Sequence, residues 1–419
     1  MTNKVTYNRE HIKTTGRCIS SDTISRPEKQ TTTTMKTSPE RLTSVDSLRG
    51  IAILLVLAVH ISGFIAPKSE WLTELTRLGP RGVQLFYVVS AFSLFLSFAH
   101  RRSAAGFSYR AYFIRRVTRI VPMFWLAMAL YLVTAGMGPN YWAPDGIKPA
   151  DVTLTVLFLN GWSPTTINSI VPGGWSVAIE TTFYLVLPFC FLWIRSLRAA
   201  VIATALALAA RHILCTWAFN AQLSNFPDSQ HYLPFTFAWE FWLPAQLPVF
   251  MLGVVLFFVR EKLQAAKLGL GFGWLAGALV VITASRYVPA DAFISNSFLA
   301  GTGFALLALA LFDRDVRFLD NAVLRKIGEV SFSIYLLHHL VMRYAAGYIV
   351  RILNAIGLGT SGDLAYAIAF VIIAALSTAI AMITYRLIEA PSIALGARLS
   401  KRTAPRAALP ITGQAEPAN

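Results

Sequence analysis

Apolar runs of eighteen or more residues recur along most of this chain, and they restrict its possible folds more than any other feature. An α-helix rises about 1.5 Å per residue, so runs of this length can cross the apolar core of a bilayer, which is about 30 Å thick. Charged residues make up only 14% of the 419 positions, whereas about a quarter is usual in soluble domains. The sequence therefore predicts one integral membrane domain and excludes a soluble enzyme.

We expect an all-α polytopic membrane protein with about ten transmembrane helices, whose even number places both termini on the same side, the cytoplasmic one. The apolar run at 152–162 is too short to span and is expected to be re-entrant or interfacial. The predicted spans lie near Leu48–Ala66, Gly82–Ala99, Ile120–Gly138, Trp175–Ile194, Ala199–Phe219, Leu243–Val259, Leu268–Val288, Phe298–Phe312, Val330–Val350 and Leu364–Ile388.

The two ends of the chain differ from its body in composition. Residues 1–43 are rich in Thr, Ser, Lys and Arg and have no apolar core of a signal peptide, so we expect a disordered basic cytoplasmic tail. Residues 396–419 are expected to form a disordered C-terminal tail, which leaves a transmembrane domain at 44–395. The three cysteines, Cys18, Cys190 and Cys215, are scattered and predict neither a disulfide framework nor a metal site.

The net charge of +16 would indicate a nucleic-acid partner in a soluble protein. With both termini in the cytoplasm, however, most Lys and Arg residues fall in cytoplasmic segments, as the positive-inside rule requires. The charge is therefore explained by topology. We expect membrane lipids but no nucleic acid among the partners, and a multi-pass location in the inner, cytoplasmic membrane.

Arg49 and His60 lie in the first predicted helix. They are eleven residues apart, about three turns, so both side chains project from one face and are separated by about 16 Å along the axis. With Arg49 at the cytoplasmic mouth and His60 near mid-membrane, the spacing suits a long ligand with an anionic end and a reactive end. The alternative is that Arg49 is a positive-inside anchor and His60 is a buried, hydrogen-bonded histidine.

Arg116 and Arg119 share a helix face near the cytoplasmic start of the third span. Guanidinium groups match phosphate oxygens in pairs, so this pattern indicates a cradle for a phosphate-bearing donor arriving from the cytosol. Contact with lipid headgroups is the alternative.

Glu180 lies about one and a half turns into the helix that begins at Trp175. Trp175 fits an interfacial aromatic belt, whereas an intramembrane carboxylate needs a partner or a function. Counted from opposite membrane faces, Glu180 and His60 can lie at comparable depth, which permits a carboxylate–imidazole pair. The sequence leaves open whether their helix faces meet.

Ser331, Tyr335 and His338 form one polar stripe at i, i+4 and i+7, directly before His339. Such a stripe can line a site, or it can be hydrogen-bonding contact between helices. Near the end of the last span, Glu389 is expected to pair with an arginine.

These motifs, in this order, resemble the membrane acyltransferase family 3, which O-acylates cell-surface carbohydrates and some small molecules. The resemblance runs from about Ser44 to Pro391, and its most specific element is a basic residue, ten intervening positions and a histidine. Two positions depart from the family pattern, with Ala91 in place of a usual Gly and His339 in place of a common aromatic. The matching residues are Arg49 with His60, Phe86 with Ser90, the run Arg115–Pro122, the run Trp175–Tyr184, and Ser331, Tyr335 and His338.

The resemblance implies transfer of an acyl group, most often acetyl from acetyl-CoA, to a hydroxyl, without a bound cofactor. A hydroxyl is a poor nucleophile at neutral pH, so we expect His60 as the base and Glu180 as its orienting partner. The acceptor is expected to be a carbohydrate or lipid-linked glycan, such as an exopolysaccharide or lipopolysaccharide unit, with a cytosolic small molecule as the alternative. Donor or substrate binding is assigned to Arg49, Arg116, Arg119, Ser90, Trp175, Tyr184, Ser331, Tyr335 and His338.

A proton-coupled transporter or flippase is the main alternative class, because intramembrane His and Glu also occur in carriers. The absence of an evident internal repeat in the sequence and the phosphate-cradle placement of the arginines argue against it. A non-catalytic assembly subunit is a third possibility.

Overall fold

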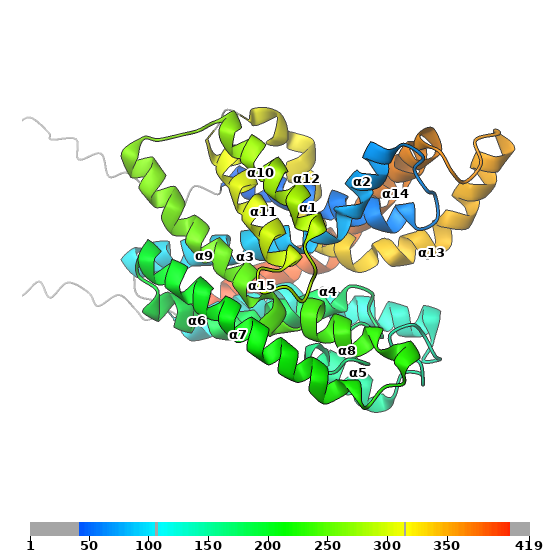
Figure 1. Ribbon diagram of the computed structural model, residues 1–419, viewed down its shortest axis with the longest axis horizontal. Coiled ribbons are helices and arrows are strands. Elements are labelled where there is room, and N and C mark those ends of the chain that lie inside the picture. The colour runs from blue at the N-terminus through cyan, green and yellow to red at the C-terminus, as the bar shows by residue number, and fades with distance from the viewer. Residues whose placement is uncertain (1–41, 105–107, 314–315, 403–419) are drawn as a thin grey trace, which may run out of the picture. The chain divides into compact units, whose positions relative to one another are not determined.

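The computed structural model describes residues 42–104, 108–313 and 316–402, and the regular elements in these ranges are all helices (Figure 1). This confirms the all-α prediction. The α-helices are α1 Thr43–Ser62, α2 Glu70–Arg77, α3 Gly82–Ala104, α4 Tyr109–Ala135, α5 Pro149–Val156, α6 Gly174–Trp193, α7 Leu197–Leu223, α8 Tyr232–Thr236, α9 Leu243–Ala266, α10 Phe272–Ala284, α11 Asn296–Phe312, α12 Ala322–Glu329, α13 Ser331–Ala355, α14 Asp363–Thr384 and α15 Ala390–Arg402.

Seven helical stretches in the described residues are both long and apolar enough to cross a bilayer, and they contain α1, α3, α4, α6, α7, α9 and α14. The helices α10 and α11 are apolar but shorter. The protein is therefore a multi-pass membrane protein. Each of the ten predicted segments coincides with a helix, while the number that span and the side of the termini stay predictions.

Several boundaries differ from the predicted ones. Helix α1 ends at Ser62 rather than near Ala66, so His60 lies in its last turn. The predicted interfacial piece is the short helix α5 followed by a 3-10 turn at Asn160–Trp162. Helix α15 continues past position 395 to Arg402. The rest of the predicted tails, 1–41 and 403–419, lies outside the described residues, as does Cys18.

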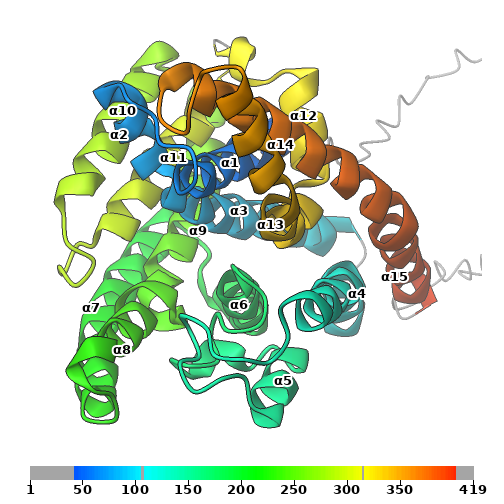
Figure 2. The same cartoon turned by 90° about the vertical axis from the view of Figure 1, so that its right-hand side faces the viewer.

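Helix α1 lies among several other helices and packs against α3, α12, α13 and α14 (Figures 1 and 2). Small residues permit this packing, because a side chain at Gly50 would meet the backbone of α12 and one at Gly328 would meet the backbone of α1. The Asp320 carboxylate accepts hydrogen bonds from Ser47 Oγ at 2.6 Å and Arg325 Nε at 2.7 Å. Burial would raise the pKa of Asp320, but these hydrogen bonds outweigh it and lower the pKa.

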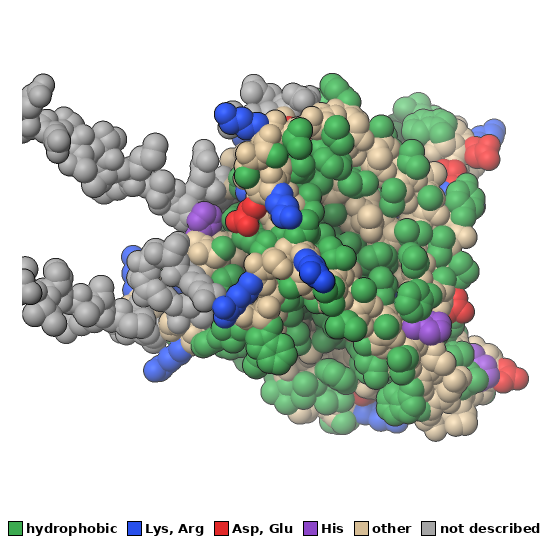
Figure 3. All heavy atoms as spheres, turned by 60° about the vertical axis from the view of Figure 1, so that its left-hand side comes forward, with side chains coloured by type: hydrophobic (Ala, Val, Ile, Leu, Met, Phe, Trp, Pro, Cys, Tyr) green, Lys and Arg blue, Asp and Glu red, His purple; other side chains and the backbone are tan. Residues whose placement is uncertain are grey.

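The outer helices carry exposed apolar side chains, among them Leu206, Ile213 and Trp217 on α7 and Val371 on α14. Such positions are typical of helix faces in contact with lipid. Apolar side chains cover much of the face in Figure 3, and most of the visible Lys and Arg side chains lie toward its left. Figure 2 shows α1, α3 and α13 near one another, with α6 and α4 below them; α6 contacts α3, and α4 contacts α13.

Candidate active site

A pocket opens where α1, α3, α4, α6 and α13 meet. Its empty space is about 740 Å³, counting the part that is open to solvent. Three arginines and one glutamate line it, so its lining carries an excess of positive charge. The lining residues are Arg49, Val83, Phe86, Tyr87, Ser90, Ser93, Arg116, Arg119, Ile120, Ser176, Val177, Glu180, Tyr184, Ser331, Phe332 and Tyr335.

Arg116 lies between two aromatic side chains in the wall of the pocket. Its guanidinium lies 6.0 Å from the ring centre of Tyr112 and 5.7 Å from that of Tyr184, so two aromatic rings fix its position. Its buried Nε has no hydrogen-bond partner among the described residues. Arg49 Nη1 lies 3.5 Å from an Asp46 oxygen, which is a weak ion pair. Both guanidinium groups therefore have hydrogen-bonding capacity left for an anionic ligand.

Glu180 connects three of the helices that line the pocket. The hydroxyl of Ser90 on α3 donates to Glu180 Oε1, and the phenol of Tyr184, one turn on in α6, donates to the same oxygen at 2.6 Å. Tyr184 also faces Arg116 of α4. Two hydroxyl donors from different helices meet on one carboxylate oxygen, so these contacts fix the shape of this wall.

Tyr335 connects α13 to the start of α6. Its phenol donates to the carbonyl of Gly173 at 3.1 Å and accepts from Ser176 Oγ at 2.9 Å. Gly173 has φ +82°, a left-handed conformation that favours glycine, and an added Cβ would lie 2.9 Å from the Tyr335 hydroxyl. The ring of Phe86 packs edge-on against the ring of Tyr335, and the two ring centres are 6.1 Å apart. The Gly-Gly-Trp-Ser start of α6 therefore positions this tyrosine.

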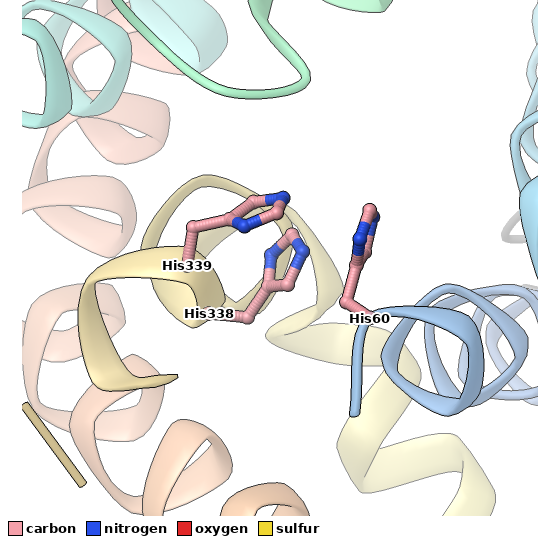
Figure 4. A group of neighbouring side chains, drawn as sticks. All are labelled: His60, His338 and His339. Carbon is pink, nitrogen blue, oxygen red and sulfur yellow. The ribbon is translucent and has the colours of Figure 1, made fainter. Parts of the chain in front are cut away.

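Three histidines meet beside the pocket, His60 from α1 and His338 and His339 from α13 (Figure 4). The ring centres of His60 and His339 are 4.3 Å apart, and those of His60 and His338 are 5.2 Å apart. Tyr335 lies between this cluster and the pocket, because it lines the pocket and its ring centre is 6.0 Å from that of His338.

The tautomer of His338 follows from its partners. Nδ1 lies 2.7 Å from the carbonyl oxygen of Tyr335 and 3.2 Å from that of Ile334. A carbonyl can only accept, so Nδ1 carries the hydrogen and Nε2 carries the lone pair. Nε2 is buried and has no hydrogen-bond partner among the described residues.

Eight of the predicted site residues line the one pocket: Arg49, Ser90, Arg116, Arg119, Glu180, Tyr184, Ser331 and Tyr335. The predicted pair of His60 with Glu180 is not formed among the described residues. His60 contacts two imidazoles, and Glu180 accepts hydrogen bonds from Ser90 and Tyr184. The prediction compared depths along two helices, but the rotation of each helix about its axis decides which side chains meet.

Trp175 and Glu389 have packing partners that the motifs do not specify. The indole of Trp175 is buried and stacks on Phe241 with ring centres 4.0 Å apart, so it is not among the residues that line the pocket. Glu389, in the π-helical turn Tyr385–Glu389, accepts a hydrogen bond from Ser333 and also interacts electrostatically with Arg119.

Sequence reasoning missed two members of the site. Ser176 lies within the Trp175 motif, and its small polar side chain one residue into the helix was the available signal. His339 was noted only as a departure from the family pattern. A second histidine directly after His338 was the signal for the cluster, but its contact with His60 depends on how α1 and α13 pack.

Comparison with known proteins now decides the family. A family model described as an acyltransferase domain matches residues 42–386, which contain α1 to α14, the residues that line the pocket and the three histidines. The chain belongs to this acyltransferase family. It is therefore a membrane-embedded member of a family of acyl-group transferases.

Three curated relatives match most of the chain, and one of them is named as an acyltransferase. Acyltransferase MdmB of Streptomyces mycarofaciens is 29% identical over 73% of this chain and 80% of its own length. Exopolysaccharide production protein ExoZ of Rhizobium meliloti (strain 1021) is 28% identical over 76% of this chain and 91% of its own. Nodulation protein 10 of Rhizobium leguminosarum bv. viciae is 28% identical over 66% and 75%. No solved structure matches this acyltransferase significantly.

Proposed function

We propose that the protein is an inner-membrane O-acetyltransferase that moves an acetyl group from cytosolic acetyl-CoA to a hydroxyl of a carbohydrate. The observation that carries the proposal is the pocket, in which three arginines and a hydrogen-bonded glutamate from distant parts of the sequence meet. Its excess positive charge fits the phosphates of an acyl-CoA, and its position beside His60 fits a thioester at the far end of the same ligand.

Arg49, Arg116 and Arg119 bind the donor in this proposal. Arg116 has a buried N–H without a partner among the described residues, and a phosphate oxygen would supply one. Arg49 and His60 lie about 16 Å apart along α1, a distance that an extended donor can bridge. With the arginines at the cytoplasmic end of the pocket, the thioester lies toward Tyr335 and the histidines.

His60 acts as the general base. Its neutral imidazole takes the proton of the acceptor hydroxyl as the oxygen forms a bond to the thioester carbonyl carbon. Collapse of the tetrahedral intermediate breaks the carbon–sulfur bond, and the CoA thiolate leaves with the electron pair and takes the proton from the His60 imidazolium, which becomes neutral again. The ester is the product. Glu180 has a separate role, which is to fix Ser90 and Tyr184 in the wall of the pocket.

A carbohydrate acceptor is supported by the loops expected on the outer face. Tyr141 and Tyr232 stack with ring centres 4.4 Å apart, and Tyr232 donates to the carbonyl of Tyr141 at 2.6 Å, so the loop between α4 and α5 is joined to the start of α8. Tyr141 and Trp162 expose about half or more of their surface, and aromatic faces suit sugar rings. The name of the relative ExoZ refers to exopolysaccharide production, which agrees with this choice.

The test uses full-length protein in nanodiscs with acetyl-labelled CoA and a panel of exopolysaccharide, lipopolysaccharide and small hydroxyl acceptors. We expect ester-linked label on a glycan, and mass spectrometry of surface polysaccharide from a deletion strain should show the same acetyl group missing. Label on a small molecule alone would contradict the carbohydrate acceptor. Glycan movement into proteoliposomes without labelled product would favour a flippase.

A further inference from the structure

We propose that His60, His338 and His339 form a binding site for a divalent transition-metal ion, with Zn²⁺ as the best match. One ligand nitrogen from each ring lies within 4.8 Å of the others. The side chains come from two helices and point into the same space in Figure 4. The sequence-based expectation of no metal site rested on the cysteines, whereas the cluster consists of imidazoles.

The partners of His338 are those of a metal ligand. A metal-bound histidine almost always donates its other ring N–H to a carbonyl or carboxylate, which fixes the tautomer and directs the free lone pair at the ion. Nδ1 of His338 makes such hydrogen bonds to Tyr335 and Ile334. Nε2 is buried and has no partner among the described residues, and a buried acceptor without a partner is unfavourable because it has lost its hydrogen bond to water. A metal ion would supply the missing partner.

The geometry requires only a small adjustment. Zinc–nitrogen bonds of about 2.05 Å in a tetrahedral site place the ligand nitrogens about 3.4 Å apart. The present spread of up to 4.8 Å therefore closes by side-chain rotations that move each ring by roughly an ångström. His60 and His339 are only partly buried, so an ion can enter from their side.

The ligand set selects the type of ion. Three neutral imidazoles suit Zn²⁺ and its neighbours in the transition series, whereas Mg²⁺ and Ca²⁺ need oxygen ligands. Three protein ligands also leave a fourth tetrahedral position open for water or an acceptor hydroxyl.

One consequence rests on the proposed function. An imidazole nitrogen bound to zinc has no lone pair for a proton, so metal binding and base catalysis by the same nitrogen of His60 exclude each other. Zn²⁺ should therefore inhibit acyl transfer, and a chelator should restore it.

Metal binding is tested first, without any enzyme assay. Full-length protein carrying a tag without histidines is treated with EDTA, returned to metal-free buffer in nanodiscs, and titrated with Co²⁺ and then Zn²⁺. We expect about one Co²⁺ per chain with the visible bands of a four-coordinate nitrogen site, no thiolate charge-transfer band, and displacement by Zn²⁺. Absence of stoichiometric Co²⁺ and Zn²⁺ binding would overturn the proposal.

His339→Phe assigns the site, because phenylalanine keeps the ring volume and removes the ligand. Its affinity for Co²⁺ should fall by at least roughly 100-fold, since loss of outer partners alone costs about 10- to 100-fold. His212→Phe, at an exposed histidine on α7, is the matched control and should bind like the parent. His339→Gln serves if the phenylalanine variant fails to fold. Unchanged affinity in a folded His339 variant would place the metal elsewhere.

The same samples separate this proposal from the proposed function. The rate of acyl transfer with Zn²⁺, divided by the rate without it, should be well below one for the parent and close to one for His339→Phe. Metal binding at the histidines together with stimulated transfer would keep the metal site and contradict the free-base role of His60. Active protein that neither binds a metal ion nor changes its rate of acyl transfer when Zn²⁺ is added would contradict the metal site and leave the base role of His60 intact.

Discussion

The arginine pocket and the histidine cluster share two helices but differ in their chemistry. Helix α1 carries Arg49 into the pocket and His60 into the cluster, and α13 carries Tyr335 and His338 in the same way. The pocket is charged and open to solvent. The cluster consists of imidazoles, and the buried Nε2 of His338 has no hydrogen-bond partner among the described residues.

This difference indicates a division of labour along the two helices. Open, cationic surroundings bind an anionic group without burying its charge, whereas an uncharged, partly buried imidazole can accept a proton or a metal ion. Tyr335 connects the two regions, because it lines the pocket and its own carbonyl holds the His338 ring. The predictions below test whether the regions act separately.

The largest expected effect is an all-or-none result on membrane topology. Helix α4 is long enough to cross the membrane, and Arg110 and Asp145 are exposed residues near its start and beyond its end. In a background lacking the three cysteines, Arg110→Cys should react only with a reagent supplied from the cytoplasm. Asp145→Cys should react only from outside. Labelling of both from one side would remove the basis for a donor pocket that opens to the cytosol.

The next largest effect is expected at His60. Replacement by Ala should lower acyl transfer by about 10²- to 10⁴-fold, the usual contribution of a general base, while KM for acyl-CoA changes little because the arginines are intact. Steady-state kinetics on protein that elutes like the parent in size-exclusion chromatography would measure this. Activity within tenfold of the parent would mean that another residue is the base. It would contradict the proposal that the pocket binds the donor while the histidine cluster supplies the base.

The sequence predicts where the helices are, because an apolar run is a local signal that does not depend on its neighbours. It also predicts that Arg49, Arg116 and Arg119 share a pocket, since one phosphate-bearing ligand explains all three. Packing partners are not predictable in this way. The short amphipathic helix α12 on α1 was not expected, and its close approach depends on Gly50 and Gly328.

The histidine contacts show the same limit. Depth along a helix follows from counting residues at about 1.5 Å each, and on that basis Glu180 was expected opposite His60. The angle about the helix axis is set by side-chain packing between helices, which no local pattern contains. In the structure, the rotation of α6 about its axis directs Glu180 toward Ser90 and Tyr184. The rotation of α1 directs His60 toward α13.

A smaller effect, confined to the donor, is expected for Arg116→Lys. Lysine keeps the charge but loses the planar fork and much of the contact with the two tyrosine rings. KM for acyl-CoA should rise about tenfold, which corresponds to about 1.4 kcal/mol, and KM for the acceptor should stay nearly unchanged. The exposed Arg110, changed to Lys, is the control. Equal increases in both KM values would indicate a structural role.

The smallest effect is expected for Gly173→Ala, which tests the connection between the two regions. Alanine at φ +82° costs about 1 to 2 kcal/mol, and its Cβ would also press on the Tyr335 hydroxyl.

Gly357→Ala is the matched control, because Gly357 follows the end of α13 with φ +77° and has open space around its Cβ position. Both variants should lose a similar amount of thermal stability from the backbone alone. Only Gly173→Ala should also lower kcat for acyl transfer, by several-fold, because displacing Tyr335 moves the carbonyl that holds His338. Equal kcat values in the two alanine variants would mean that the pocket and the histidines are not connected through this tyrosine.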